Sequence, residues 1–252
     1  MAIADVAQSE APAIPPLGSD IAPARVALIA GLGLLTMALL APFAVFGVLG
    51  ALVVPGDARS TFDNLVSSQG LFRTGIAVLL VVVMLDVIVA WTLFVLLRPV
   101  HRSIALLTAW LRLAFATVFG GALFHLLDAA ETVAGAGQSA LPIEQLHAQV
   151  MSSVSLFEVG WTGIALGIFG LHLLGLGYLL YKSVDFPRFL GLLVVIAGAG
   201  YIVDSLGTIL VPDYGMTVAT FTFVGEALLI FWLLRRAVTG LRHDPDDPHL
   251  HR

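Results

Sequence analysis

The chain has 252 residues, of which 59% are hydrophobic and only 12% are charged, and its formal net charge is −5. Soluble domains carry roughly 25% charged residues, so this composition excludes a soluble globular protein and predicts an integral membrane protein. Cysteine is absent, which excludes disulfides, a thiolate nucleophile and Cys-ligated metals. No basic patch indicates a nucleic-acid partner, and no sequence motif indicates a cofactor.

Six apolar runs follow one another along the chain, each near or above the roughly 20 residues that a helix needs to cross the hydrocarbon core. They cover residues 26–54, 72–97, 104–128, 152–181, 189–211 and 216–234. Because a spanning backbone must satisfy its own hydrogen bonds, we expect an all-α polytopic membrane protein with six transmembrane helices in one bundle.

The spans predict one transmembrane domain over residues 25–236, flanked by two polar tails. Residues 1–24 are rich in Ala and Pro and lack a basic n-region, so we expect a disordered tail and not a signal peptide. Residues 237–252 are predicted to form a second polar, unstructured tail.

Basic residues in the loops predict the orientation. One face of the bundle receives nine of them, namely Arg25, Arg98, Arg102, Lys182, Arg188, Arg235, Arg236, Arg242 and Arg252. The other face receives only Arg59 and Arg73. The positive-inside rule therefore places both termini in the cytoplasm. The low lysine content and heavy use of Ala and Gly favour a bacterial source and the bacterial cytoplasmic membrane, the inner membrane of the cell.

The two longest loops, residues 55–71 and 129–151, then lie on the opposite face. Residues 61–67 are predicted to form a short interfacial helix with Phe62, Leu65 and Val66 on its apolar side. Residues 141–147 begin with a helix-starting proline, and we expect this segment to lie across the external mouth of the bundle.

Seven ionisable side chains fall within the predicted spans: Asp86, Arg112, His125, Glu158, His172, Asp204 and Glu226. Such residues are rare at membrane depth, and those that occur usually face the protein interior. At about 1.5 Å of rise per residue, Asp86 and Arg112 lie within about 5 Å of the same depth on neighbouring helices. We therefore predict an ion pair between them, either as part of a functional site or as an interhelical clamp.

Asp204 and Glu226 are similarly matched in depth across the turn at residues 212–215, and His172 and Tyr201 fall in the same central slab. Two anions in a low dielectric should not both stay ionised, which predicts a shared proton or a bound cation. The pocket candidates are thus Asp86, Arg112, His172, Tyr201, Asp204 and Glu226. For His172 and Tyr201 alone, a buried hydrogen bond or simple packing remains the alternative.

The fourth span carries two nearly opposite stripes. One is polar and aromatic, with Glu158, Thr162, Ala165, Phe169 and His172. The other contains Gly160, Gly163, Gly167 and Gly170, and small residues of this kind let helix backbones approach closely. We expect this helix to lie at the centre of the bundle.

A second group of polar residues is expected near the external mouth, formed by His125, Asp128 and Glu158. Three ligands are too few to predict a metal site. A bis-histidine haem is disfavoured, because His125 and His172 differ in depth by about 20 Å. No metal and no cofactor is therefore predicted.

Five short blocks resemble a bacterial membrane family known as domain of unknown function 4386. They read GLFRTG at 70–75, LLRPV at 96–100, GLGYLLYK at 175–182, FPRFLG at 186–191 and GYIVDS at 200–205. The resemblance covers roughly residues 25–234 and implies a multi-pass membrane protein without assigned chemistry. It transfers no catalytic residue to this chain.

Three function classes remain open. The polar pocket could bind or conduct a proton, a cation or a small polar ligand. Alternatively, an intramembrane enzyme could act on a lipid or isoprenoid, with Asp204 or Glu226 as general acid and His172 as base. A structural or assembly role would need no pocket. Membrane lipids are the expected partners in each case, and the opening of the pocket discriminates between the three.

Overall fold

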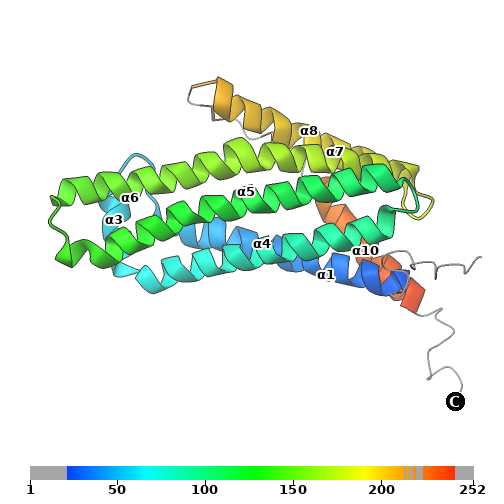
Figure 1. Ribbon diagram of the computed structural model, residues 1–252, viewed down its shortest axis with the longest axis horizontal. Coiled ribbons are helices and arrows are strands. Elements are labelled where there is room, and N and C mark those ends of the chain that lie inside the picture. Colours follow the sequence, from blue (N-terminus) through cyan, green and yellow to red (C-terminus); the bar gives the residue numbers. More distant parts are fainter. Residues whose placement is uncertain (1–21, 213, 216–217, 220–223, 242–252) are drawn as a thin grey trace, which may run out of the picture.

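The computed structural model describes residues 22–212, 214–215, 218–219 and 224–241, and every regular element within these ranges is a helix. The elements are α1 (Pro23–Pro42), η1 (Phe43–Leu49), α2 (Gly50–Leu52), α3 (Ala58–Ser67), α4 (Gln69–Leu97), α5 (Arg102–Gly135), η2 (Ala136–Gln138), α6 (Ile143–Glu158), η3 (Val159–Ala165), α7 (Leu166–Lys182), α8 (Arg188–Leu210) and α10 (Val224–Leu241). The long helices lie side by side in one elongated bundle (Figure 1). The predicted all-α fold is confirmed.

Five helices in the described residues are long and apolar enough to span a membrane, against the six predicted. Two of them contain a π-helical turn, so α1, η1 and α2 form one helix of 30 residues, and α6, η3 and α7 form one of 40 residues. The sixth predicted span, residues 216–234, starts at positions that lie outside the described residues. Its described part, α10, carries Glu226, Arg235 and Arg236 and is therefore less apolar.

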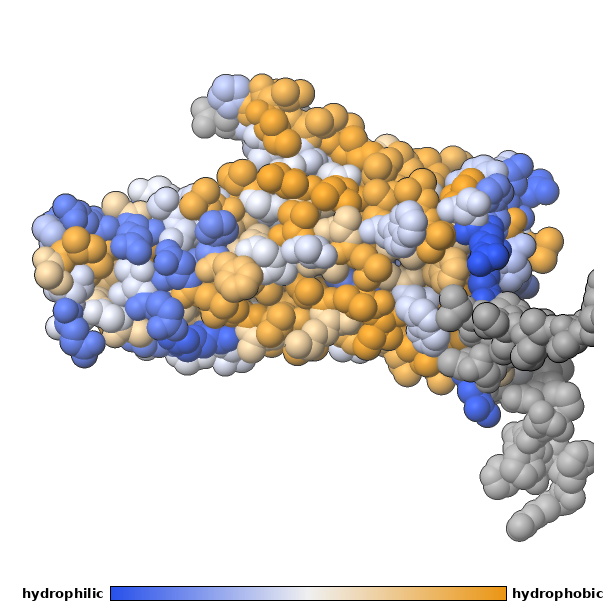
Figure 2. All heavy atoms as spheres, viewed as in Figure 1, coloured by the Kyte–Doolittle hydropathy of each residue, from blue (hydrophilic) through white to orange (hydrophobic). Residues whose placement is uncertain are grey.

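The helix formed by α6, η3 and α7 is longer than a bilayer requires. Its 40 residues correspond to about 60 Å, twice the roughly 30 Å of the hydrocarbon core. Figure 2 shows hydrophobic residues along the middle of the visible face of the bundle and hydrophilic residues gathered at the end that holds α3 and the start of α6. One end of the bundle therefore extends beyond the apolar band.

The structure at that end differs from two predictions made for the loops. Residues 141–147 do not lie across the mouth, because α6 begins at Ile143 and continues directly into the spanning helix. The short helix α3 forms as predicted, but its apolar side packs on protein: Phe62 and Leu65 are buried, and the Phe62 ring lies 4.8 Å from the His147 ring. Val66 is exposed. The two long loops at this end therefore form a small packed helical cap.

Glycines let α7 and α8 approach closely. A Cβ added to Gly170 would lie 2.6 Å from the Gly198 carbonyl oxygen, and one added to Gly177 would lie 2.6 Å from the Gly191 carbonyl oxygen. Ser205 of α8 also donates a hydrogen bond to the Gly163 carbonyl within the π-helical turn, where regular helical bonding is interrupted. The close packing predicted from the glycine stripe is thus confirmed.

Helix α1 begins and α10 ends at the same end of the bundle as the turns after α4 and α7. Pro23, Arg98, Asp185 and Arg236, one from each of these four places, line a common groove. This arrangement agrees with an even number of crossings. The cytoplasmic side, the type of membrane and the domain limits stay predictions, and most of both predicted tails, residues 1–21 and 242–252, lies outside the described residues.

Candidate functional site

Helices α4, α5 and α7 bring three polar side chains together in the interior of the bundle. Arg112 Nη2 lies 2.7 Å from Asp86 Oδ1, and Asp86, Arg112 and His172 are exposed by only 0%, 2% and 0%. The ion pair predicted from helix depth is therefore present. Neither Asp86 oxygen has an aligned hydrogen-bond donor within the described residues, so charge attraction, and not an in-line hydrogen bond, holds this contact.

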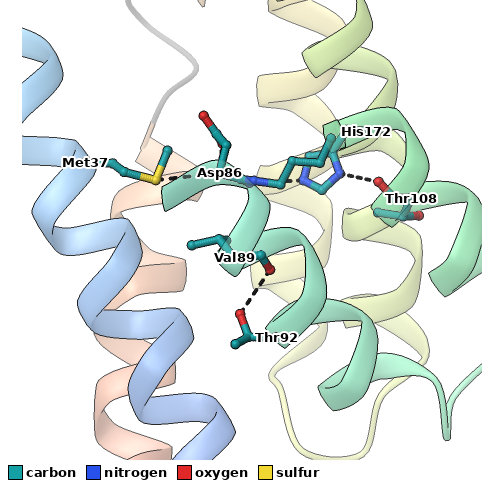
Figure 3. A network of polar contacts seen from close by, with 7 residues as sticks. Met37, Asp86, Val89, Thr92, Thr108 and His172 are labelled. Atoms are coloured by element: carbon teal, nitrogen blue, oxygen red, sulfur yellow. Dashed lines mark hydrogen bonds and ion pairs between the residues drawn. The ribbon is translucent and has the colours of Figure 1, made fainter. Parts of the chain in front are cut away.

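His172 connects the ion pair to the backbone of α5 (Figure 3). Its Nδ1 lies 2.8 Å from the Thr108 carbonyl oxygen, and its Nε2 lies 3.3 Å from Arg112 Nη1. A carbonyl can only accept and a guanidinium can only donate. The neutral tautomer with hydrogen on Nδ1 therefore satisfies both contacts, and His172 acts as an acceptor for Arg112.

Apolar and polarisable groups complete the surroundings of Arg112. Its guanidinium lies over the Phe169 ring, 5.4 Å from the centroid, and Nη2 lies 4.0 Å from Met37 Sδ of α1. Arg112 Nε has no hydrogen-bond partner in the described part of the chain. The guanidinium is thus held by one carboxylate, one imidazole and weaker contacts in a site almost without solvent.

Glu226 of α10 belongs to the same cluster. Its carboxyl interacts electrostatically with both Arg112 and Asp86, and the Tyr201 hydroxyl is its side-chain hydrogen-bond partner. The Oε1 atom is buried and has no partner among the described residues. Tyr201 packs edge-on against Phe169, with 5.5 Å between ring centroids. Direct contacts therefore link Asp86, Arg112 and His172, whereas Glu226 interacts with Arg112 and Asp86 through charge and with Tyr201 through a hydrogen bond.

Asp204 has different partners. Its carboxylate accepts hydrogen bonds from the Tyr214 hydroxyl at 2.8 Å and from the backbone N–H groups of Val218 and Ala219 at 2.8 and 2.7 Å. The bond from Tyr214, which lies beyond the end of α8, raises the pKa of that phenol above its ordinary value of 10.0. Asp204 therefore anchors the segment after α8. A proton or cation shared between Asp204 and Glu226 stays a prediction.

The three outer candidates do not gather into one metal-binding group. Asp128 accepts a hydrogen bond from Ser153 at 2.6 Å, His125 is half-buried, and Glu158 is exposed. Among the described residues, no three His, Asp or Glu side chains lie together as a metal site would require. Ser153 was not a candidate from sequence, because a serine within a helical run carries no distinct signal.

A small cavity reaches the cluster beside His172. Its volume is about 10 Å³, and Ala90, Leu93, Thr108 and Leu179 are among the residues that line it. A site of this size holds about one water molecule. Sequence reasoning missed Thr108 and Met37 as parts of the cluster, because a backbone carbonyl and a thioether leave no recognisable pattern.

Comparisons with known proteins identify the family of the chain without giving its chemistry. The family model described as "Domain of unknown function (DUF4386)" matches residues 29–237. An uncharacterised protein of the archaeon Archaeoglobus fulgidus is 33% identical over 153 residues, which are 61% of this chain and 77% of the relative. No solved structure matches.

Proposed function

The chain belongs to the DUF4386 family, and we propose that it is an integral membrane protein that takes up and releases one proton at the cluster of Asp86, Arg112, His172 and Glu226. The observation that carries the proposal is the charge count of the cluster. Two carboxyl groups accompany one guanidinium, and the contacts of His172 fit its neutral form.

Net charge in a low dielectric costs several kcal/mol even after relaxation. With both carboxylates ionised, the cluster would carry one net negative charge, and a proton on one of them removes it. Asp86 lies 2.7 Å from the guanidinium, whereas the hydrogen-bond partner of Glu226 is a neutral phenol. We therefore assign the proton to Glu226.

The size of the cavity supports a proton as the ligand. The space beside His172 is about 10 Å³, which accommodates about one water molecule and is far too small for a lipid or an isoprenoid chain. The intramembrane enzyme considered from sequence would need a wider, laterally open site. A proton needs only hydrogen-bonding groups near one another, here the pair of His172 and Arg112 and the pair of Tyr201 and Glu226.

The proton would alter how α10 is held. Ionised Glu226 attracts Arg112 and repels Asp86, and both interactions cease when the carboxyl is neutral. Because the cluster joins α4, α5, α7 and α10, proton uptake would shift the attachment of α10 to the other three helices. Proton-coupled movement of this helix is the process that the cluster fits best.

Infrared difference spectroscopy of the protein in lipid tests this assignment. Between acidic and alkaline buffer, the wild type should show the C=O stretch of one protonated carboxyl, and Glu226→Gln should lack it. Glu158→Gln removes an exposed carboxylate of the same chain and should keep the band. Loss of the band in Asp204→Asn as well would indicate a proton shared by both groups. An unchanged band in Glu226→Gln would refute the proposal.

A further inference from the structure

A groove of about 690 Å³ opens at the end of the bundle where α1 begins and where α4 and α7 end. Its walls are apolar deeper in the bundle, where Val26, Val95 and Leu96 are almost completely buried. Its rim is polar and includes Arg98, His101, Tyr178, Lys182, Asp185 and Arg236. The groove is thus amphipathic, with charge at its mouth and aliphatic side chains below.

The charges at the rim are mostly positive. The groove is lined by three cations, Arg98, Lys182 and Arg236, and by one carboxylate, Asp185. The Asp185 carboxylate lies 2.6 Å from Arg236 Nη1. Arg98 and Lys182 form no ion pair with any other described residue. His101 Nδ1 is engaged, because it accepts the Ile104 N–H at the start of α5. Two cations of the groove are therefore available to an anion.

The position of the groove selects the kind of anion. Arg98 caps the C-terminal end of α4, and Lys182 is the last residue of α7, so both lie where spanning helices leave the hydrocarbon. Tyr178 lies one turn before Lys182 and is 41% exposed, as expected for an aromatic residue at the membrane interface. Basic pockets between helices at this level suit phosphorylated lipid headgroups.

We propose that this groove binds the phosphate of an anionic membrane lipid. Arg98 and Lys182 contact the phosphate, and the first methylene groups of the acyl chains lie against Val95 and Leu96. Guanidinium and ammonium groups together suit this ligand, since the first binds phosphate through paired hydrogen bonds and the second acts as a compact charge. The site is independent of the buried proton cluster.

Native mass spectrometry of the delipidated full chain in detergent tests the site. Dioleoyl phosphatidylglycerol is titrated against the wild type and against Arg98→Gln/Lys182→Gln, with dioleoyl phosphatidylcholine as the zwitterionic comparison. The double variant should bind phosphatidylglycerol about 30-fold more weakly, from the contribution of each basic residue near an anionic headgroup. The matched control Arg59→Gln/Arg73→Gln removes two charges from the opposite end and should bind as the wild type does.

A second variant avoids any effect on folding. Val184 lines the groove and is 99% exposed, so Val184→Asp adds a negative charge to the mouth without disturbing packing. It should weaken phosphatidylglycerol binding, whereas Val184→Asn should not. Equal binding by all variants, or equal binding of both lipids, would overturn the proposal.

Two further arms distinguish other sources of the anion. Inorganic phosphate should not displace phosphatidylglycerol, because it lacks the acyl chains; displacement at equal concentration would instead assign the groove to free phosphate. The chain also has acidic residues at Asp244, Asp246 and Asp247. If phosphatidylglycerol binds only after all three are changed to Asn, the groove belongs to this acidic segment and the lipid proposal is wrong.

Discussion

Arg112 and Asp86 form an ion pair of 2.7 Å between α5 and α4, and 2% and 0% of their side chains are exposed. Two charges this deep attract each other strongly, but each has lost its hydration, so the pair contributes little net stability. Removing one partner is different, because the remaining charge is left buried alone. The pair therefore fixes the position of α5 along α4. It also places the Arg112 guanidinium where His172 and Glu226 can interact with it.

The first prediction concerns this pair. Asp86→Asn and Arg112→Leu should each lower the free energy of unfolding in detergent by about 3–5 kcal/mol. The double variant should lose clearly less than the sum, because the coupling between contacting residues is then absent. The exposed pair of Arg73 and Glu131, at 2.9 Å, is the control and should contribute about 0–1 kcal/mol. Strictly additive losses at Asp86 and Arg112 would contradict the prediction.

The second prediction concerns the contact between α7 and α8. A methyl group at position 170 would meet the Gly198 carbonyl oxygen at 2.6 Å and the Ile202 backbone nitrogen at 3.1 Å, and backbone atoms cannot move aside cheaply. Gly170→Ala should therefore lower the free energy of unfolding by about 1–3 kcal/mol.

Gly121 provides the control, since a Cβ added there would meet nothing within 4 Å. Gly121→Ala should leave stability unchanged or raise it slightly, because Ala favours helix. Thermal unfolding in detergent measures both variants. If Gly170→Ala is as stable as Gly121→Ala, then α7 and α8 are not packed as closely as the structure shows.

The third prediction is a local pH dependence in the helical cap. The Ser60 hydroxyl and N–H donate to Asp57, the N-cap of α3, and lower the pKa of its carboxyl below the ordinary 3.8. A lowered folded pKa contributes stability above the unfolded pKa, and this contribution is lost as pH falls through the folded pKa. The first turn of α3 should therefore begin to fray as pH falls below 3.8.

Amide hydrogen exchange over residues 58–62 measures this fraying. Asp57→Asn keeps a capping side chain without a titrating group, and it should lose the pH dependence. Asp63→Asn changes an exposed carboxylate on the same helix and should retain it. The same pH profile in Asp57→Asn as in the wild type would assign the effect to another group.

The ion pair of Asp86 and Arg112 could be predicted from sequence, because the number of residues between each of them and the connecting turn gives its depth in the bundle. Helix α4 ends at Leu97 and α5 begins at Arg102, so the turn is short and the rise per residue gives both depths. The glycine contacts of α7 were predictable for a similar reason, since small residues at regular spacing indicate a close helix neighbour.

The polar stripe of the fourth span could not be predicted as a whole. The π-helical turn at Val159–Ala165 changes the number of residues per turn, so a stripe drawn at 100° per residue is rotated across it. His172 and Phe169 therefore face the interior, whereas Glu158, before the turn, is exposed. Neither π-helical turn leaves a sequence signal that separates it from regular helix.

The hydrogen-bond partners of Asp204 could not be predicted from the sequence, for a different reason. Depth matching compares residues on two straight helices, but Asp204 bonds to Tyr214 and to backbone N–H groups of the connecting segment. Loop backbone has no periodicity from which such contacts could be read.

The fourth prediction is the topology, which single cysteines can test without a background because the chain contains none. His101 and Val184 lie in the turns after α4 and α7. Asp63 lies in α3 and Gln138 in η2, at the end of the bundle that holds α3 and the start of α6. In intact cells, a membrane-impermeant maleimide should label Asp63→Cys and Gln138→Cys. It should label His101→Cys and Val184→Cys only after the membrane is opened.

Met84→Cys is the control for membrane depth. Met84 lies near the middle of α4 and is 56% exposed, so its side chain faces outward at a level where the apolar band excludes water. It should remain unlabelled before and after opening, because a maleimide needs the thiolate and therefore contact with water. Labelling of Val184→Cys in intact cells would reverse the orientation that the nine basic residues predict. Labelling of Met84→Cys would instead show that the outer face of α4 lies against water and not against lipid.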